Sequence, residues 1–323
     1  MATSQEKVNE IIELHVAGKT SRKIANLIGG SIGKSTVNDI IKRWKEGDTE
    51  YSDSRTNLKT HLPKVLTFDL ETAPIRAAVW SLWKQNVGLS MIEDDWFLLS
   101  YAAKWLGDPD DKIFYDDLRG TVNSQDDTKL LDAMWVLLDE ADIVLTQNGK
   151  RFDVKKINAR FILNGYQPPS GYKHIDTLDI AKRVFGFTSN KLEYMTDKLC
   201  EKKKLKHTKF PGFELWSAML QDIPEAWDEC EEYNKMDVLS LEELYFVMAP
   251  WDDKHPNFNL YVDSDEMVCR CGSHNVVKSG FAYTQVSKFQ KYRCKDCGTE
   301  TRDRKNLFSK EKRDSLLLNI NNR

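Results

Sequence analysis

The sequence predicts a mixed α/β fold, in which a sheet is flanked by helices, with a small all-α module before it and a small β module after it. Three observations lead to this prediction. Apolar, strand-like runs begin at residue 65 and then alternate with helical patterns up to about residue 250. Residues 6–46 show helical periodicity alone. Four of the six cysteines gather between residues 269 and 297.

The length of 323 residues allows one core of about 150–200 residues together with one or two small modules. The sequence contains no apolar run near the roughly 18–20 residues that a membrane span needs. It also lacks the apolar segment of an export signal near its start. We therefore expect a soluble, cytoplasmic protein with no membrane partner.

The net charge of −3 hides an uneven distribution. Residues 1–60 contain 10 Lys and Arg against 8 Asp and Glu, and residues 267–323 contain 13 against 5. The whole chain contains 47 Lys and Arg and 50 Asp and Glu, so the middle has 24 basic residues against 37 acidic ones. Basic ends favour polyanion-binding modules, although solvated tails would have the same composition, and the acidic middle indicates a domain that collects carboxylates.

Three short helices are expected in residues 6–46, and the last two resemble a helix-turn-helix, with Ala25 where the helices cross and Gly29 in the turn. We predict a DNA-binding domain over residues 1–50, followed by a linker over 51–63. A three-helix protein-interaction unit is the alternative. In the DNA-binding interpretation, the side chains expected to face a major groove are those of Lys34, Ser35, Thr36, Asn38 and Lys42.

The middle domain is expected over residues 64–252 and begins with a buried strand at residues 65–70. Further strands are predicted at residues 97–102, 112–115 and 143–147. Helices are predicted at about residues 126–140, 153–164, 176–185, 192–200 and 224–248. Strands that come first and then alternate with helices indicate a mixed sheet.

Asp69 and Glu71 lie two residues apart at the end of the first strand, so their side chains project from the same face. Burying two like charges together is costly unless a cation compensates them. The pair therefore favours a divalent metal ion with oxygen ligands. A surface strand end with alternating acids would show the same pattern.

Two further patterns add acidic side chains. Asp153 lies where the strand at residues 143–147 gives way to a helix, which is also the position of an ordinary N-cap. Tyr233 and Asp237 are four residues apart in a long helix, so they share one face, as they would in any amphipathic helix. Each pattern alone is weak, and the prediction depends on their combination.

In combination the residues resemble the DEDD exonucleases of the ribonuclease H-like fold, in the DEDDy branch whose third motif is Tyr-x-x-x-Asp. The matching motifs are Asp69-x-Glu71, Asn148-x-x-x-Phe152-Asp153 and Tyr233-x-x-x-Asp237. The second motif is most similar to that of the family B DNA polymerase proofreading domain. The resemblance extends over about residues 64–252, without a polymerase-sized remainder.

This resemblance implies a metal-dependent 3′→5′ exonuclease that hydrolyses DNA by a two-metal-ion mechanism. It implies that two Mg²⁺ or Mn²⁺ ions are held by Asp69, Glu71, Asp153 and Asp237. Asp69 would bridge both ions, and Tyr233 would orient the attacking water. Asn148 and Phe152 would position the terminal nucleotide. A basic run that either grips the phosphate backbone or forms a solvated loop comprises Lys202, Lys203, Lys204, Lys206 and His207.

A connector over residues 253–266 leads to a β-like module over 267–304, which resembles a zinc ribbon. Its expected ligands to one structural Zn²⁺ are Cys269, Cys271, Cys294 and Cys297. The first pair departs from the usual spacing, because C-x-C replaces C-x-x-C, and His274 is an alternative to Cys269. Aromatic and basic residues between the pairs suit either nucleic-acid contact or stabilisation of the module. The basic tail over 305–323 is expected to be poorly ordered.

The leading functional prediction is a 3′→5′ DNA exonuclease with a DNA-binding module at each end. It would act in phage or mobile-element DNA replication or repair, on a single-stranded 3′ end or on duplex DNA, together with replication proteins. Two alternatives stay open. One is a DNA-binding regulator or recruitment factor that uses the nuclease fold as a scaffold, and the other is a nuclease that acts on RNA or on a particular nucleic-acid structure.

Overall fold

The computed structural model describes residues 5–17, 19–28, 32–45, 62–262 and 266–318. The chain divides into two compact units, one built around the N-terminal helices and the other around residues 63–259 and the segment that begins at Glu266. Most of the predicted linker lies outside the described residues. No helix among the described residues combines the length and the apolar character needed to cross a membrane.

The N-terminal unit contains the three helices predicted for residues 6–46. They are α1 (Gln5–Val16), α2 (Ser21–Ile28) and α3 (Lys34–Lys45). Each helix contributes one apolar stripe to a shared core, as expected for amphipathic helices that are too short to be stable alone. The buried core residues are Val8, Ile11, Ile24, Ile32, Val37, Ile40 and Ile41.

The second unit contains a five-stranded mixed sheet with strand order β5-β4-β1-β6-β7. The strands are β1 (Val65–Thr72), β4 (Leu98–Trp105), β5 (Phe114–Asp117), β6 (Ile143–Thr146) and β7 (Lys173–Asp176). The β1–β4 and β4–β5 pairs are antiparallel, whereas β1–β6 and β6–β7 are parallel. The predicted mixed α/β class is therefore confirmed.

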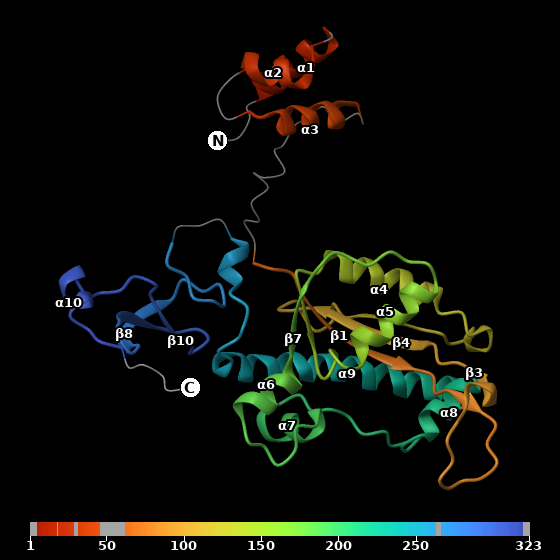
Figure 1. The fold of residues 1–323 in the computed structure, drawn as a ribbon. Helices are drawn as coiled ribbons and strands as arrows, with labels where there is room; N and C mark the ends of the chain where they lie inside the picture. Colours follow the sequence, from red (N-terminus) through yellow and green to blue (C-terminus); the bar gives the residue numbers. More distant parts are fainter. Residues whose placement is uncertain (1–4, 18, 29–31, 46–61, 263–265, 319–323) are drawn as a thin grey trace. The chain divides into compact units, whose positions relative to one another are not determined.

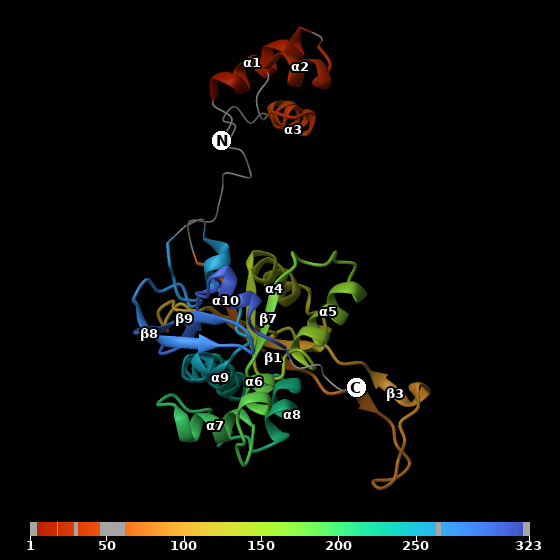
Figure 2. The same cartoon turned by 60° about the vertical axis from the view of Figure 1, so that its left-hand side comes forward.

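Helices cover both faces of this sheet, which is why its central strand is apolar on both sides. In Figure 1, α4 (Thr128–Glu140) and α5 (Asp153–Leu163) lie on one face, and the long α9 (Pro224–Met248) crosses the other. Figure 2 shows the same layers after rotation. The remaining helices are α6 (Thr177–Val184), α7 (Leu192–Leu199) and α8 (Glu214–Leu220). Short 3₁₀ turns occur at Leu89–Met91, Val122–Ser124, Ala249–Trp251 and Phe258–Tyr261.

Several elements were not predicted. The strand expected at 112–115 forms two residues later, and β7 and α8 are short elements whose sequences have no clear period. Two further strands, β2 (Arg76–Ala77) and β3 (Ile92–Asp94), pair at the base of an arm that follows β1. The tail expected to be poorly ordered contains α10 (Lys310–Asp314), which Ser309 caps by accepting the Lys312 amide hydrogen.

The C-terminal module is a three-stranded antiparallel sheet in the order β10-β9-β8. Its strands are β8 (Val276–Tyr283), β9 (Lys288–Cys294) and β10 (Glu300–Arg302). The Arg270 side chain donates to the carbonyl oxygens of Ala249 and Pro250 at 3.1 and 3.4 Å. These bonds attach the module to the segment that directly follows α9.

Candidate active site

The first two predicted acids lie where β1 ends. Asp69 and Glu71 are half-buried and stand on the same face of the strand, opposite Ala102 and Ser100 of β4. The pairing register shifts between Glu71 and Thr72, so the regular ladder stops at this point. An irregularity at a strand end turns side chains away from the sheet and towards an edge.

The loop after β6 brings the second motif to the same edge. Asn148 has a φ of 66°, and a Cβ added at Gly149 would come within 2.2 Å of the Thr146 hydroxyl, so only glycine fits there. The buried carboxylate of Asp176 accepts the backbone N–H groups of Asn148 and Lys150 at 2.9 and 3.1 Å. These contacts hold the loop in the shape that starts α5.

Asp153 is 4% exposed and lies in the first turn of α5. Its Oδ1 accepts the backbone N–H of Leu70 at 3.3 Å. Leu70 lies between the two acids of β1, so this bond ties the second motif to the first. The ordinary N-cap interpretation does not fit, because Asp153 follows the N-cap residue Phe152.

Helix α9 supplies the third motif. Its Asn234 side chain donates from Nδ2 to Asp69 Oδ2 at 2.7 Å and accepts the Ser100 hydroxyl at 3.2 Å. Asp237 is 3% exposed, and its Oδ1 is buried without a hydrogen-bond partner among the described residues. Asn234 is not among the predicted site residues, although its place in the helix next to Tyr233 and one turn from Asp237 is a usable signal.

Burial makes this group of carboxylates hard to ionise. It raises the pKa of Glu71 to about 8 and that of Asp153 to about 7, and the charge of Asp237 adds to both shifts. Burial likewise raises the pKa of Asp69 and of Asp237, and three neighbouring carboxylates raise that of Asp69 further. The four acids are thus close enough to repel one another.

Lys204 supplies a cation to this group. Its ammonium group bonds Asp237 Oδ2 and lies 4.3 Å from the ring centre of Tyr233. Lys202, Lys203 and Lys206 pair with Asp110, Asp197 and Glu193 at 2.5, 3.2 and 3.1 Å, whereas the His207 ring packs against the Tyr233 ring with 4.2 Å between the ring centres. The run therefore divides into two residues at the site, Lys204 and His207, and three lysines in surface ion pairs, which its sequence did not reveal.

The oxygen atoms and the unpaired Asp237 Oδ1 suit Mg²⁺ or Mn²⁺, which bind carboxylates. Among the described residues, however, only the four cysteines bring three or more potential ligand atoms within 4.8 Å of one another. The four carboxylates therefore do not form a cluster of that closeness, although they raise one another's pKa values. Divalent cations would draw them together.

Aromatic side chains form a groove next to this edge. The groove has a volume of about 550 Å³ and begins at Thr72, directly after Glu71. The Lys156 ammonium lies 3.7 Å from the Trp96 ring centre and 5.7 Å from that of Phe152. The groove is lined by Thr72, Ala73, Pro74, Ile75, Trp96, Lys156, Phe213 and Trp216. On the other side of the site, Asn148 and Lys204 line a separate pocket of about 500 Å³.

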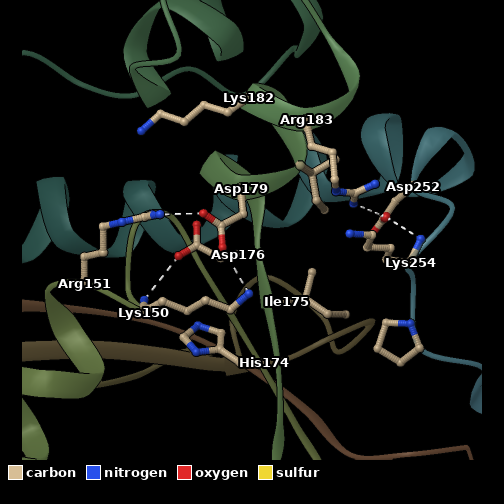
Figure 3. Close-up of a pocket in the computed structure, with 12 residues that line it drawn as sticks. Lys150, Arg151, His174, Ile175, Asp176, Asp179, Lys182, Arg183, Asp252 and Lys254 are labelled. Atoms are coloured by element: carbon tan, nitrogen blue, oxygen red, sulfur yellow. Dashed lines mark hydrogen bonds and ion pairs between the residues drawn. The ribbon is translucent and has the colours of Figure 1, made fainter. Parts of the chain in front are cut away.

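A further pocket of about 480 Å³ contains none of the five predicted catalytic residues. In Figure 3, Lys150 and Arg151 converge on Asp179, and Arg183 points to Asp252. Because these cations are already paired with carboxylates, the pocket offers less free charge than its composition suggests. We do not assign it to the active site.

The four cysteines of the C-terminal module form a second candidate metal centre. All four sulfur atoms lie within 4.8 Å of one another, with Cys269 and Cys297 3.7 Å apart and Cys271 and Cys294 3.9 Å apart. Four thiolates at such spacing can bind one zinc ion tetrahedrally. His274, the alternative ligand, is exposed, and its Nδ1 lies 2.9 Å from Glu266.

The predicted DNA-facing residues of α3 are not all equivalent. Lys34, Asn38 and Lys42 are exposed, as a contact role requires. Thr36 is only 6% exposed, so its side chain is not available to a large partner. The side chain of Ser35 lies outside the described part of the structure.

The raised pKa values predict how stability depends on pH. In the metal-free protein, the folded pKa values of about 8 for Glu71 and about 7 for Asp153 exceed the ordinary values of 4.5 and 3.8. The folded chain therefore binds more protons than the unfolded chain between about pH 4 and pH 8. The free energy of unfolding should fall across this range, by on the order of a few kcal/mol.

Urea denaturation at several pH values, without divalent cations, measures this slope. Replacing Asp153 by asparagine should flatten it, and Mn²⁺ should restore stability most strongly at the high-pH end, where no protons must be displaced. A free energy of unfolding that rises with pH across the range would contradict the raised pKa values.

Comparison with protein-family models agrees with this fold. A sequence model described as RNase_H superfamily matches residues 108–249, a segment that includes Asp153, Tyr233 and Asp237 but begins after Asp69 and Glu71. No curated protein matches the chain. Among solved structures, the family B DNA polymerase of the hyperthermophilic archaeon Pyrobaculum calidifontis is similar, with 14% identity and a TM-score of 0.42. The similar region covers 70% of this chain and 32% of the polymerase, so the chain spans about a third of the polymerase's length. The fold is ribonuclease H-like, and the match to that superfamily supports a nuclease-type function.

Proposed function

We propose that the chain is a 3′→5′ exonuclease that hydrolyses DNA with two divalent metal ions. The observation that carries this proposal is the convergence of four carboxylates from separate parts of the chain on one sheet edge: Asp69, Glu71, Asp153 and Asp237. DNA is favoured over RNA by the resemblance of the second motif to proofreading domains, and the polarity rests on the same resemblance. The basic modules at both ends favour a nucleic acid polymer.

The proposed roles follow from the positions of the side chains. Mg²⁺ or Mn²⁺ bound to the four carboxylates would stabilise the negative charge that develops on the phosphate during hydrolysis. Burial raises the pKa of the Tyr233 phenol, so this group stays protonated and can orient a water molecule beside Asp237. Asn234 holds Asp69 through its hydrogen bond and thereby fixes the orientation of the carboxylate.

Incubation of the purified protein with 5′-labelled single-stranded DNA, duplex DNA and RNA tests the proposal. Products shortened stepwise from the 3′ end, which disappear without Mg²⁺ and in Asp69→Ala, are the expected result. Release of internal fragments would instead favour a structure-specific nuclease. Preferential degradation of RNA would identify RNA, and not DNA, as the substrate. Equal binding of DNA by wild type and Asp69→Ala, with no degradation of any substrate, would favour the scaffold alternative.

Lys204 is expected to contribute to hydrolysis. With divalent cations bound to the carboxylates, the Lys204 ammonium group beside Asp237 would stabilise the negative charge that develops on the phosphate. Replacing Lys204 by methionine should lower the hydrolysis rate about a hundredfold, by analogy with the loss of one stabilising group at an oxyanion. Single-turnover rates at saturating Mn²⁺ provide the measurement.

Lys203→Met is the matched control, because Lys203 is adjacent in the chain but pairs with Asp197 at the surface. This variant should retain nearly the full rate. Equal rates for the two variants would mean that Lys204 serves only to neutralise Asp237 in the metal-free protein.

A further inference from the structure

A long arm follows strand β1, and the proposed function gives this arm no role. We define the arm as residues 75–92, which leave the sheet after Thr72 and return at β3. In Figures 1 and 2 the arm is the orange loop that extends from the sheet beside β3. Its base is fixed by pairing of β2 with β3, by a hydrogen bond from the Ala78 amide to the Met91 carbonyl at 2.9 Å, and by an ion pair between Arg76 and Asp94 at 2.9 Å.

The tip of the arm exposes apolar side chains that most proteins would bury. The exposed fractions are 94% for Trp80, 88% for Leu82, 82% for Trp83 and 89% for Leu89. Within the part of the chain that the structure describes, no aromatic ring or cation packs against either tryptophan ring. A cluster of exposed apolar side chains of this size indicates a binding surface.

The charge of the arm indicates the class of partner. Residues 72–92 contain no Asp or Glu, and the acids Glu93 and Asp94 that follow lie at the base of the arm, where both pair with Arg76. Lys84 lies in the turn directly after Trp83 and is exposed. The tip of the arm, which combines flat aromatic rings with a cation and carries no acid, suits the bases and phosphates of a nucleic acid.

The position of the arm connects it to the carboxylates. The aromatic groove begins at Thr72 and includes Ile75, the first residue of the arm. Trp80 follows Glu71 by nine residues, so its backbone lies within about 30 Å of Glu71. A strand whose end lies at the carboxylates can therefore continue along the groove to the arm.

We propose that Trp80 and Trp83 form a stacking platform for unpaired bases of the nucleic acid whose end is hydrolysed. This inference rests on the proposed function and adds to it a preference for single strands. In a duplex the faces of the bases are covered by their neighbours, whereas an unpaired strand can present them to the indole rings. A protein partner or a second copy of the chain would be the competing occupant of such an apolar surface.

Binding of labelled oligonucleotides tests the platform without any need for hydrolysis. The full-length chain carrying Asp69→Ala is titrated with a single-stranded thymidine oligonucleotide and with a blunt duplex, in buffer without added divalent cations or chelator. Adding Trp80→Ala and Trp83→Ala together should weaken single-strand binding at least about tenfold and leave duplex binding nearly unchanged. Because both rings are exposed, the thermal unfolding curve should not change.

Two controls make the result specific. Trp80→Phe with Trp83→Phe keeps two aromatic faces and should retain most of the affinity. Trp251→Ala removes another exposed tryptophan, which lies in the 3₁₀ turn after α9 and outside the arm, and should have no effect. Unchanged single-strand affinity in the double alanine variant overturns the platform, as does an equal loss of duplex affinity. Loss of self-association in ultracentrifugation with intact oligonucleotide binding would assign the arm to a second copy of the chain.

The outcomes separate this inference from the proposed function. If the wild-type chain degrades no substrate but the double alanine variant loses single-strand affinity, the platform stands and the exonuclease proposal fails. If the chain is an exonuclease and the variant binds as well as its parent, only the platform fails.

Discussion

Replacing Asp237 by asparagine is expected to slow nucleic-acid hydrolysis by at least about a thousandfold. The reason lies in the environment of this carboxylate, which is 3% exposed and has one oxygen without a hydrogen-bond partner among the described residues. Asparagine has nearly the same shape but cannot offer a negative charge to a cation. The change would therefore remove a proposed metal ligand while keeping the packing of α9. Single-turnover rates and calorimetric titration with Mn²⁺ give the two measurements.

Glu232→Gln provides a matched control, because Glu232 is exposed on the same helix and the substitution also exchanges an acid for an amide. It should retain the wild-type rate and Mn²⁺ affinity. If Asp237→Asn keeps more than about a tenth of the wild-type rate, Asp237 does not hold a catalytic cation, and Lys204 would be its structural partner instead.

Replacing Cys294 by serine is expected to remove the bound zinc and to unfold the C-terminal module. Cys294 is 1% exposed and is the last residue of β9. The core of the module is small and includes the buried ring of Phe289. A zinc ion bound to the four cysteines would stabilise such a small module, since structural zinc contributes on the order of 10 kcal/mol to folding. Metal analysis should fall from one zinc per chain to none. Hydrogen exchange should become fast in β8 and β9 and stay slow in β1.

Two control variants define the ligands. Cys200→Ser removes a buried cysteine that lies outside the cluster, and His274→Ala removes the alternative ligand, which faces Glu266. Both should retain stoichiometric zinc. Loss of zinc from His274→Ala would show that this histidine, in place of one of the cysteines, is a zinc ligand. Retained zinc in Cys294→Ser would reject the four-cysteine site.

The parts of the fold that could be predicted are those in which local pattern and tertiary environment agree. The apolar run of β1 could be predicted because this strand lies between two others with helices on both faces. The helical periodicity of α9 could be predicted because this long helix packs along the sheet. The strand β7 was missed because its four residues include a lysine and a histidine at its start. The arm was missed because it has almost no regular structure.

The sequence by itself determined the order of the elements, the spacing of the carboxylate motifs and the four cysteines, because these depend on residue type and local periodicity. Only the tertiary structure decided which side chains meet. Asn234 reaches Asp69 across 165 positions of sequence, and the buried Lys104 pairs with Glu242 at 2.5 Å across 138 positions. In the sequence Lys204 cannot be told from the neighbouring lysines, and only the fold places its ammonium group on Asp237. Such contacts depend on how α9 and the loop between α7 and α8 lie against the sheet, which is set by the packing of the whole core and not by any local pattern.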